Sequence, residues 1–135
     1  MSLIQVRDLR KVFGEQVVLS DINFDVQDGQ IRVLMGASGS GKSTLLQCLN
    51  RLEDPTSGSI IFRGKEVAGP DVDVRALRKQ IGFVFQQFNL LPKVTALENV
   101  ALPLLYANVA ARERERRARA ELERVGLGDR THNTR

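Results

Sequence analysis

The sequence predicts an α/β fold, in which short apolar strands lead into amphipathic helices. Three observations support this prediction. Apolar runs at residues 3–9, 21–26 and 31–35 have the length of strands and are separated by turn-forming residues. A glycine-rich loop follows the third run, and helical apolar spacing begins directly behind that loop. With 135 residues, of which 42% are hydrophobic, the chain is long enough to bury a core without disulfides.

The first two apolar runs are predicted to form an antiparallel flank. In the run at 21–26 every second residue is apolar, which is the period of a strand with one buried face. Asp28-Gly29 stands between apolar runs and favours the positive φ angles of a tight hairpin turn. Residues 31–35 are therefore expected to form the third strand, which leads into the glycine-rich loop.

The middle of the chain is expected to alternate between helices and strands. A helix is predicted from Lys42 to Leu52, because leucines recur at helical spacing until Asp54-Pro55. The segments that follow are a strand at 59–63 with a short partner at 64–65, a small helix at 74–80, a strand at 81–85 and an irregular stretch at 86–93.

Two helices are predicted in the last third of the chain. Thr95 and Glu98 are three residues apart and form a capping box that begins the first of them, and Pro103 is expected to kink or restart it. The second spans about residues 110–125 and ends at Gly126. Its thin apolar stripe consists of Ala111, Ala118, Leu122 and Val125.

The net charge of +4 and the pI of about 9.7 arise largely from arginines in this last helix. Glu113 with Arg117, and Glu115 with Arg119, are predicted to pair along the helix and give a solvated face, with a docking surface as the alternative. No nucleic-acid partner is expected, because there is no recognisable reading helix and only 5% of residues are aromatic. Cys48 is the single cysteine and is predicted to be a small core residue.

The glycine-rich loop carries the clearest chemistry in the sequence. Its glycines permit backbone N–H groups to approach a phosphate, and the following helix adds its positive N-terminus. Lys42 is predicted to bridge the β and γ phosphates, and the Ser43 hydroxyl to ligate magnesium. An accidental glycine-rich turn is disfavoured because a strand and a helix flank the pattern. The predicted site for ATP with Mg²⁺ consists of Gly36, Ala37, Ser38, Gly39, Ser40, Gly41, Lys42, Ser43 and Thr44.

Beside this loop, three further motifs resemble the ATP-binding subunits of ABC transporters, over nearly the whole chain. The first is Phe13-Gly14, some twenty residues ahead of the loop. The resemblance implies that the Phe13 ring stacks on adenine in place of the family's more usual tyrosine. The alternative is a core aromatic at the edge of a strand.

The second motif, residues 83–92, resembles the segment that contains the family's glutamine loop. The resemblance implies that the amide of Gln86 touches the metal and the attacking water, and that its loop leans on a membrane subunit. A neutral amide suits that task because it can offer oxygen to magnesium without adding charge. Gln87 competes for the role, and a solvated loop glutamine is the plain alternative.

The third motif, residues 95–106, is similar to the start of the family's helical subdomain. Glu98 in this segment is interpreted as a helix cap and not as a catalytic carboxylate. The expected organisation is an ATP-binding core at residues 1–94, the start of the helical subdomain at 95–127 and a loose tail at 128–135. Individual segments are similar both to polar amino acid importers and to lipoprotein and macrolide exporters, so the transported substrate stays open.

The family's later motifs are not found before Arg135. These are the signature Leu-Ser-Gly-Gly-Gln, an apolar strand ending in Asp-Glu, and a switch histidine. His132 lies in the tail and is interpreted as a solvated side chain. The fold class is therefore expected to be an incomplete P-loop ATPase domain of ABC type that binds ATP but barely hydrolyses it alone.

The resemblance also implies partners and a location. The partners are transmembrane permease subunits, docked near Gln86, and a second ATP-binding subunit in a head-to-tail dimer. The implied location is cytoplasmic and peripheral on the inner face of the cell membrane. Two alternatives stay open: a P-loop kinase that clamps phosphate with the arginines of the last helix, and a non-catalytic ATP-binding fragment.

Overall fold

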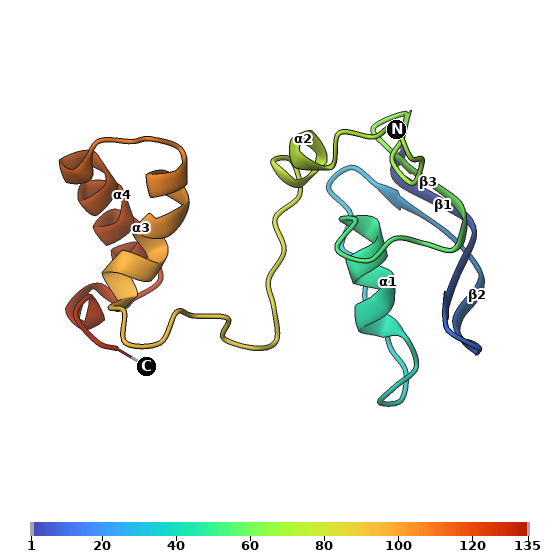
Figure 1. The fold of residues 1–135 in the computed structure, drawn as a ribbon, viewed down its shortest axis with the longest axis horizontal. Coiled ribbons are helices and arrows are strands. Elements are labelled where there is room, and N and C mark those ends of the chain that lie inside the picture. Colours follow the sequence, from blue (N-terminus) through green and yellow to red (C-terminus); the bar gives the residue numbers. More distant parts are fainter. Residues whose placement is uncertain (1, 135) are drawn as a thin grey trace. The chain divides into compact units, whose positions relative to one another are not determined.

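The computed structural model describes residues 2–134, and their contacts form two compact units that divide between Val84 and Phe85 (Figure 1). Each unit has a hydrophobic core of its own. By these contacts residues 85–94 belong with the helices that follow them, whereas the sequence places the start of the helical subdomain at residue 95.

An antiparallel sheet with strand order β2-β1-β3-β4 forms the frame of the first unit. β1 (Ser2–Phe13) and β2 (Gln16–Gln27) form a long hairpin, and β3 (Ser57–Phe62) pairs with β1 and with the short β4 (Lys65–Glu66). Gly14, at φ 57°, begins the two-residue turn of the hairpin. The predicted antiparallel flank is confirmed, with strands that extend further than the apolar runs.

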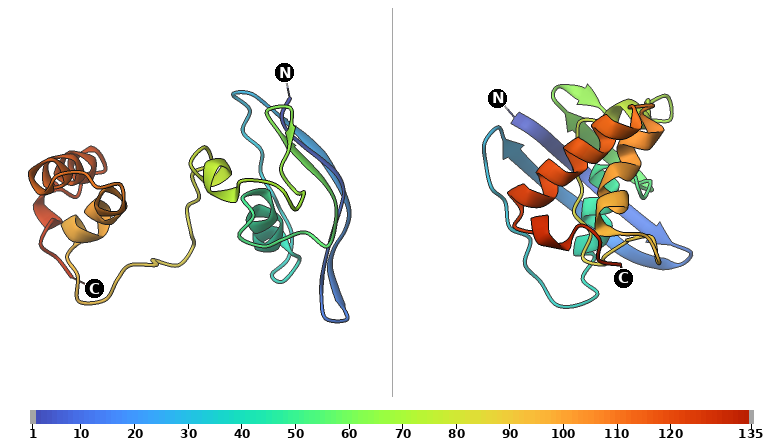
Figure 2. Two further views of the ribbon diagram at one scale, coloured as in Figure 1. Left: turned by 45° about the horizontal axis from the view of Figure 1, so that its top comes forward. Right: turned by 90° about the vertical axis from the view of Figure 1, so that its left-hand side faces the viewer.

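One face of the sheet is covered by α1 (Lys42–Leu49), as Figure 2 shows. Leu45 and Cys48 are three residues apart and both point into the core, which is the spacing of one helical face. Cys48 is fully buried, as the sequence predicts, and burial raises the pKa of its thiol. The buried residues of this core are Val6, Leu9, Leu19, Leu45, Cys48, Ile60, Phe62, Val67 and Leu77.

Two predicted strands, 31–35 and 81–85, are not formed. Both segments lack strand pairing among the described residues, and Ile31 and Met35 are 90% and 89% exposed. A strand needs a neighbour to accept and donate its ladder of hydrogen bonds, and none of the described strands pairs with these segments. The turn before residue 31 is present, with Gly29 at φ 70°, but it does not close a hairpin.

α1 and α2, the two helices described in the first unit, are shorter than predicted. α1 ends at Leu49 instead of residue 52, because Asn50 leaves the helical conformation and Arg51 takes a φ of 59°. The small helix α2 (Val74–Arg78) is present. Asp73 is its N-cap residue, and the Asp73 side chain accepts two backbone N–H groups of the first turn.

The second unit is a helical hairpin of α3 (Ala96–Tyr106) and α4 (Ala111–Arg124), followed by a short 3₁₀ turn, η1 (Gly128–Arg130). The predicted capping box at Thr95 and its partner three residues on is confirmed. Of the two outcomes predicted at Pro103, a kink or a restart, the restart does not occur, because α3 runs through Pro103 as one helix. A proline removes only one bond of the helical ladder, and the α3–α4 contact holds the remaining turns.

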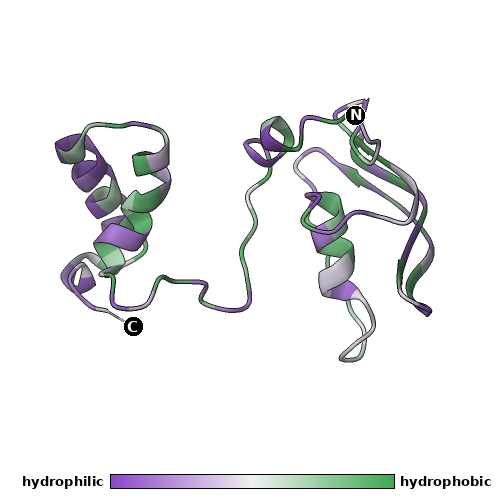
Figure 3. Cartoon of the chain, in the orientation of Figure 1, coloured by the Kyte–Doolittle hydropathy of each residue, from purple (hydrophilic) through white to green (hydrophobic). Residues whose placement is uncertain are grey.

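The hairpin core is small, and Figure 3 shows why: α4 is largely hydrophilic whereas α3 is more hydrophobic. Of the predicted apolar stripe on α4, Ala118 and Leu122 are buried against Leu97. Ala111 is exposed and Val125 is 69% exposed, so neither belongs to the stripe.

The prediction of a loose tail is wrong for residues 128–134, and Arg135 lies outside the described residues. The Thr131 carbonyl accepts the N–H of Leu97 at 3.0 Å, and the Asn133 carbonyl accepts the N–H of Ala96 at 2.8 Å. Thr131 is 3% exposed. The first N–H groups of a helix have no partner within the helix, so the tail is held in place by satisfying them.

Among residues 2–134, no helix combines the length and the apolar character that a bilayer-spanning segment needs.

Candidate functional site

The glycine-rich loop lies in the first unit, between the extended segment after β2 and the first turn of α1. Gly39 and Gly41 have φ angles of 79° and 86°, a region that L side chains rarely adopt. A Cβ added at Gly41 would lie 2.9 Å from the Val18 carbonyl oxygen and 3.0 Å from Leu19, both on β2. The end of the loop is therefore seated against the sheet and requires glycine at position 41.

The ammonium group of Lys42 is held inside the loop by its own backbone. Its Nζ donates to the carbonyls of Gly36 at 2.8 Å and Ala37 at 2.6 Å, and to the Ser40 hydroxyl at 3.2 Å. No acidic side chain contributes to these bonds. The positive charge of Lys42 is thus centred on the loop and is not neutralised by a carboxylate there.

The N-terminus of α1 has no side-chain cap. Its N-cap residue is Gly41, whose carbonyl accepts the Leu45 N–H at 2.8 Å, and no acidic residue stands in the first turn. The free N–H groups of that turn, the helix dipole and the Lys42 charge all favour an anion at the same point. Ser43 is exposed in this turn, where its hydroxyl can reach a ligand.

Magnesium fits this site as a companion of a bound nucleotide. Within residues 2–134 no three His, Cys, Asp or Glu side chains gather in a metal-binding group. Magnesium in phosphate sites takes one or two protein ligands and completes its octahedron with phosphate oxygens and water. One hydroxyl, that of Ser43, beside the glycine loop matches this donor set.

Phe13 is the last residue of β1 and is 43% exposed, so it is not a core aromatic. The Nζ of Lys11 lies 4.5 Å from the centre of its ring, within the range of a cation–π contact. Sequence reasoning missed Lys11. The signal was available, because residues two apart in a strand point to the same face.

Gln86 belongs to the second unit, and so does its competitor Gln87; both are exposed. The structure places Phe13 and the glycine loop in the first unit, and both glutamines in the second. A contact of Gln86 with the metal and water therefore stays a prediction.

The second unit also carries Glu98 and His132, the two other side chains that the sequence analysis weighed for catalysis. Glu98 accepts the hydroxyl of Thr95 at 2.7 Å and the Thr95 N–H at 2.9 Å, and these bonds lower the pKa of its carboxyl. It is an ionised helix cap, as the sequence predicts. His132 is exposed on the tail.

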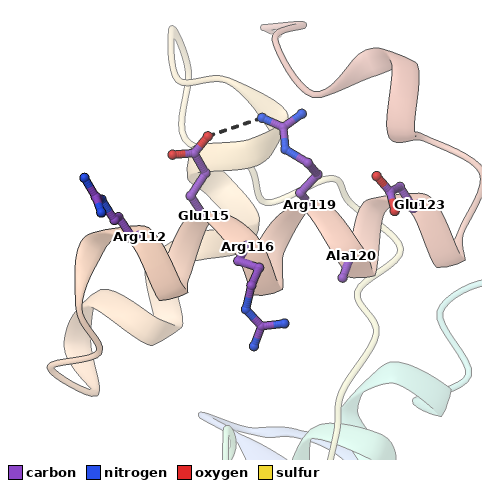
Figure 4. A pocket seen from close by; sticks show the side chains of 6 residues that line it. All are labelled: Arg112, Glu115, Arg116, Arg119, Ala120 and Glu123. Atoms are coloured by element: carbon purple, nitrogen blue, oxygen red, sulfur yellow. Dashed lines mark hydrogen bonds and ion pairs between the residues drawn. The ribbon is translucent and has the colours of Figure 1, made fainter.

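The charged side chains of α4 pair along their own helix. Glu113 lies 2.6 Å from both Arg116 and Arg117, and hydrogen bonds from these two guanidinium groups lower the pKa of Glu113 from its usual 4.5 to about 2. Glu115 pairs with Arg119 at 3.2 Å, as Figure 4 shows. The two predicted ion pairs are confirmed. The open hollow on this helix is lined by Arg112, Glu115, Arg116, Arg119, Ala120 and Glu123.

An antiparallel flank, a glycine loop seated on it and a helix that begins directly behind the loop are typical of P-loop proteins. The family model described as ABC transporter matches residues 19–135. The chain belongs to the ABC transporter family, and this family is one of ATP-binding ATPases. The predicted fold class is confirmed.

The relatives include proteins named for import and proteins named for export. The chain is 46% identical to the glutamine transport ATP-binding protein GlnQ of Escherichia coli, over 97% of this chain and 55% of GlnQ. It is also 46% identical to the pyoverdine export ATP-binding/permease protein PvdT of Pseudomonas aeruginosa, over 97% of this chain and 21% of PvdT. The chain thus spans little more than half of GlnQ.

A solved structure has the same fold. It is the dimeric post-hydrolysis state of the ATP-binding cassette MJ0796 bound to ADP and Pi. The TM-score is 0.81 at 36% identity, and the match covers 98% of this chain and 61% of the cassette.

Proposed function

We propose that this chain binds Mg-ATP on residues 36–44 as the phosphate-binding part of an ABC transporter's ATP site. One observation carries the proposal: the Lys42 ammonium is centred on a loop that ends in an uncapped helix N-terminus. Phosphate oxygens would replace the two carbonyls that now accept from Lys42, and charge-assisted hydrogen bonds to phosphate are stronger than those to neutral carbonyls. Ser43 would ligate the magnesium ion, and Phe13 would stack on the adenine.

Hydrolysis of ATP is proposed to drive transport in the full-length protein, with Gln86 in contact with water and metal. In-line attack on the γ-phosphate needs a group that positions the water. Glu98 is engaged as a cap and His132 is on the tail, so neither serves that purpose. We expect this chain alone to bind ATP with negligible turnover.

The partners are proposed to be a permease and a second ATP-binding subunit. An apolar pocket of about 310 Å³ in the second unit is lined by Phe88, Leu90, Val94 and Leu127. The apolar face of a permease helix could occupy this pocket. A permease is chosen as the partner because the name of the relative PvdT joins an ATP-binding part to a permease part. The dimeric state of the MJ0796 cassette supports a second copy as the other partner. These partners would place the chain on the inner face of the membrane.

The docking proposal has its own test. In the full-length protein, Leu90→Glu should weaken co-purification with the permease, because it places a charge in the apolar pocket. Leu105→Glu is a matched control: both leucines are nearly half exposed, but Leu105 does not line the pocket. Equal co-purification of both variants would remove the pocket from the proposal.

The substrate class is proposed to be amino acids, with uptake as the direction. The support is the similarity to GlnQ over nearly the whole chain. The equal identity to PvdT makes export the second candidate.

A binding competition tests the proposed activity. Purified chain is titrated with a fluorescent ATP analogue and magnesium, and then competed with ATP or AMP. We expect ATP to displace the analogue and AMP to fail, because AMP lacks the β and γ phosphates that Lys42 would bridge. Displacement by both at equal concentration would contradict a phosphate-centred site. Phosphoryl transfer from ATP to added nucleosides or nucleotides would favour a P-loop kinase instead.

A further inference from the structure

Lys11 is almost buried although it carries a charge. Its side chain is 11% exposed, and its Nζ donates to the Asp54 carbonyl at 2.7 Å and pairs with the Glu53 carboxylate at 3.1 Å. The same Nζ lies over the Phe13 ring, 4.5 Å from its centre. These three contacts hold the Lys11 ammonium group in one position, unlike the mobile ammonium group of an exposed surface lysine.

The contacts of Lys11 connect β1 to the segment that follows α1. Glu53 and Asp54 follow the C-terminal end of α1, whose first turn carries the glycine loop. Two further hydrogen bonds reinforce this connection: the Val12 N–H donates to the Thr56 hydroxyl at 2.9 Å, and the Thr56 N–H donates to the Arg10 carbonyl at 2.8 Å. The end of β1 that carries Phe13 is thus bonded to the segment that follows α1, the helix behind the glycine loop.

We propose that Lys11 is a positioning residue for the base of the nucleotide: it fixes the Phe13 ring relative to α1 and covers one ring face with a cation. The proposal rests on the proposed function, since it assumes that Phe13 stacks on a base. Phe13 is 43% exposed, which leaves room for that base.

The cation also favours stacking chemically. An ammonium group over one face of a phenyl ring is attracted by the negative π cloud. It offsets the repulsion between that cloud and the π electrons of a base on the opposite face. Lys11 therefore contributes both the place of the ring and its affinity for a purine, without touching the nucleotide.

The test separates the base from the phosphates. Binding of ATP and of inorganic triphosphate, each with magnesium, is measured by calorimetry for the full chain and for Lys11→Met, which keeps side-chain length and removes the charge. We expect Lys11→Met to weaken ATP by roughly three- to tenfold and to leave inorganic triphosphate within about twofold. Lys11→Arg restores a cation and should bind ATP nearly as the parent does. Lys65→Met, at an exposed lysine of β4, is the matched control and should change neither ligand.

A double substitution shows whether Lys11 acts through the ring. Phe13→Leu should weaken ATP by roughly tenfold, and adding Lys11→Met to it should cost nothing further. Equal weakening of both ligands by Lys11→Met, or full additivity with Phe13→Leu, would overturn the positioning role while the ATP site stands. A parent chain that binds neither ligand would overturn the ATP site itself and this role with it.

Discussion

The seating of the glycine loop on β2 can be tested by two matched substitutions, Gly39→Ala and Gly41→Ala. Both glycines have positive φ angles, 79° and 86°, so both variants incur the left-handed penalty of ~1–2 kcal/mol, partly offset by a less flexible unfolded chain. A Cβ at Gly39 meets nothing within 4 Å, whereas at Gly41 it lies 2.9 Å from the Val18 carbonyl oxygen.

The expected magnitudes follow from this difference. Gly39→Ala should lower the free energy of unfolding of the first unit by about 1 kcal/mol. Gly41→Ala adds the displacement of β2 backbone and of Leu19, and should cost about 2–4 kcal/mol in total.

Hydrogen exchange of β1 and β2 peptides as a function of urea measures this unit separately from the helical hairpin. Equal losses for the two variants would refute the contact between the loop and β2. A larger loss for Gly39→Ala would refute the backbone geometry of the loop itself.

Three further predictions concern the rest of the chain. Thr95→Ala removes the capping box of α3 and should lower the stability of the helical hairpin by ~1 kcal/mol in urea unfolding, whereas an unchanged midpoint would contradict the cap. Glu113 has a folded-state pKa of about 2, below its usual 4.5. Its ion pairs therefore stabilise α4 fully above pH 4.5 and are lost as pH falls through 2; an NMR titration midpoint near 4.5 would contradict them. Replacing Ile31 and Met35 together by threonine and serine should slow aggregation in light scattering and change the unfolding free energy by less than ~0.5 kcal/mol, because both side chains are exposed.

Local signals in the sequence predicted local structure well. The capping box at Thr95, the ion pairs of α4, the buried Cys48 and the glycine loop before α1 are all encoded within a few residues of one another. Such features depend on short-range hydrogen bonds and helical spacing, which the sequence displays directly.

Features that depend on distant segments were not predictable in the same way. The apolar run at 31–35 has the composition of a strand, but strand formation needs a paired neighbour, and the described residues supply none. The tail looks polar and loose, yet Thr131 is buried because its carbonyl accepts a helix N–H far away in sequence. Likewise the contacts of Lys11 with Glu53 and Asp54 depend on the path of the segment that follows α1, which passes beside β1.

Binding of the phosphates of ATP by the Lys42 charge inside the glycine loop is the core of the proposed function. It is tested most directly by calorimetric titration of Mg-ATP into the full chain and into Lys42→Met, with Lys65→Met as the control for an exposed lysine. Loss of a charged hydrogen-bond donor to phosphate costs ~1.5–3 kcal/mol, so Lys42→Met should bind ATP roughly ten- to a hundredfold more weakly while Lys65→Met binds as the parent does. Equal affinity of the parent and Lys42→Met for Mg-ATP, or no binding by the parent, would contradict the claim.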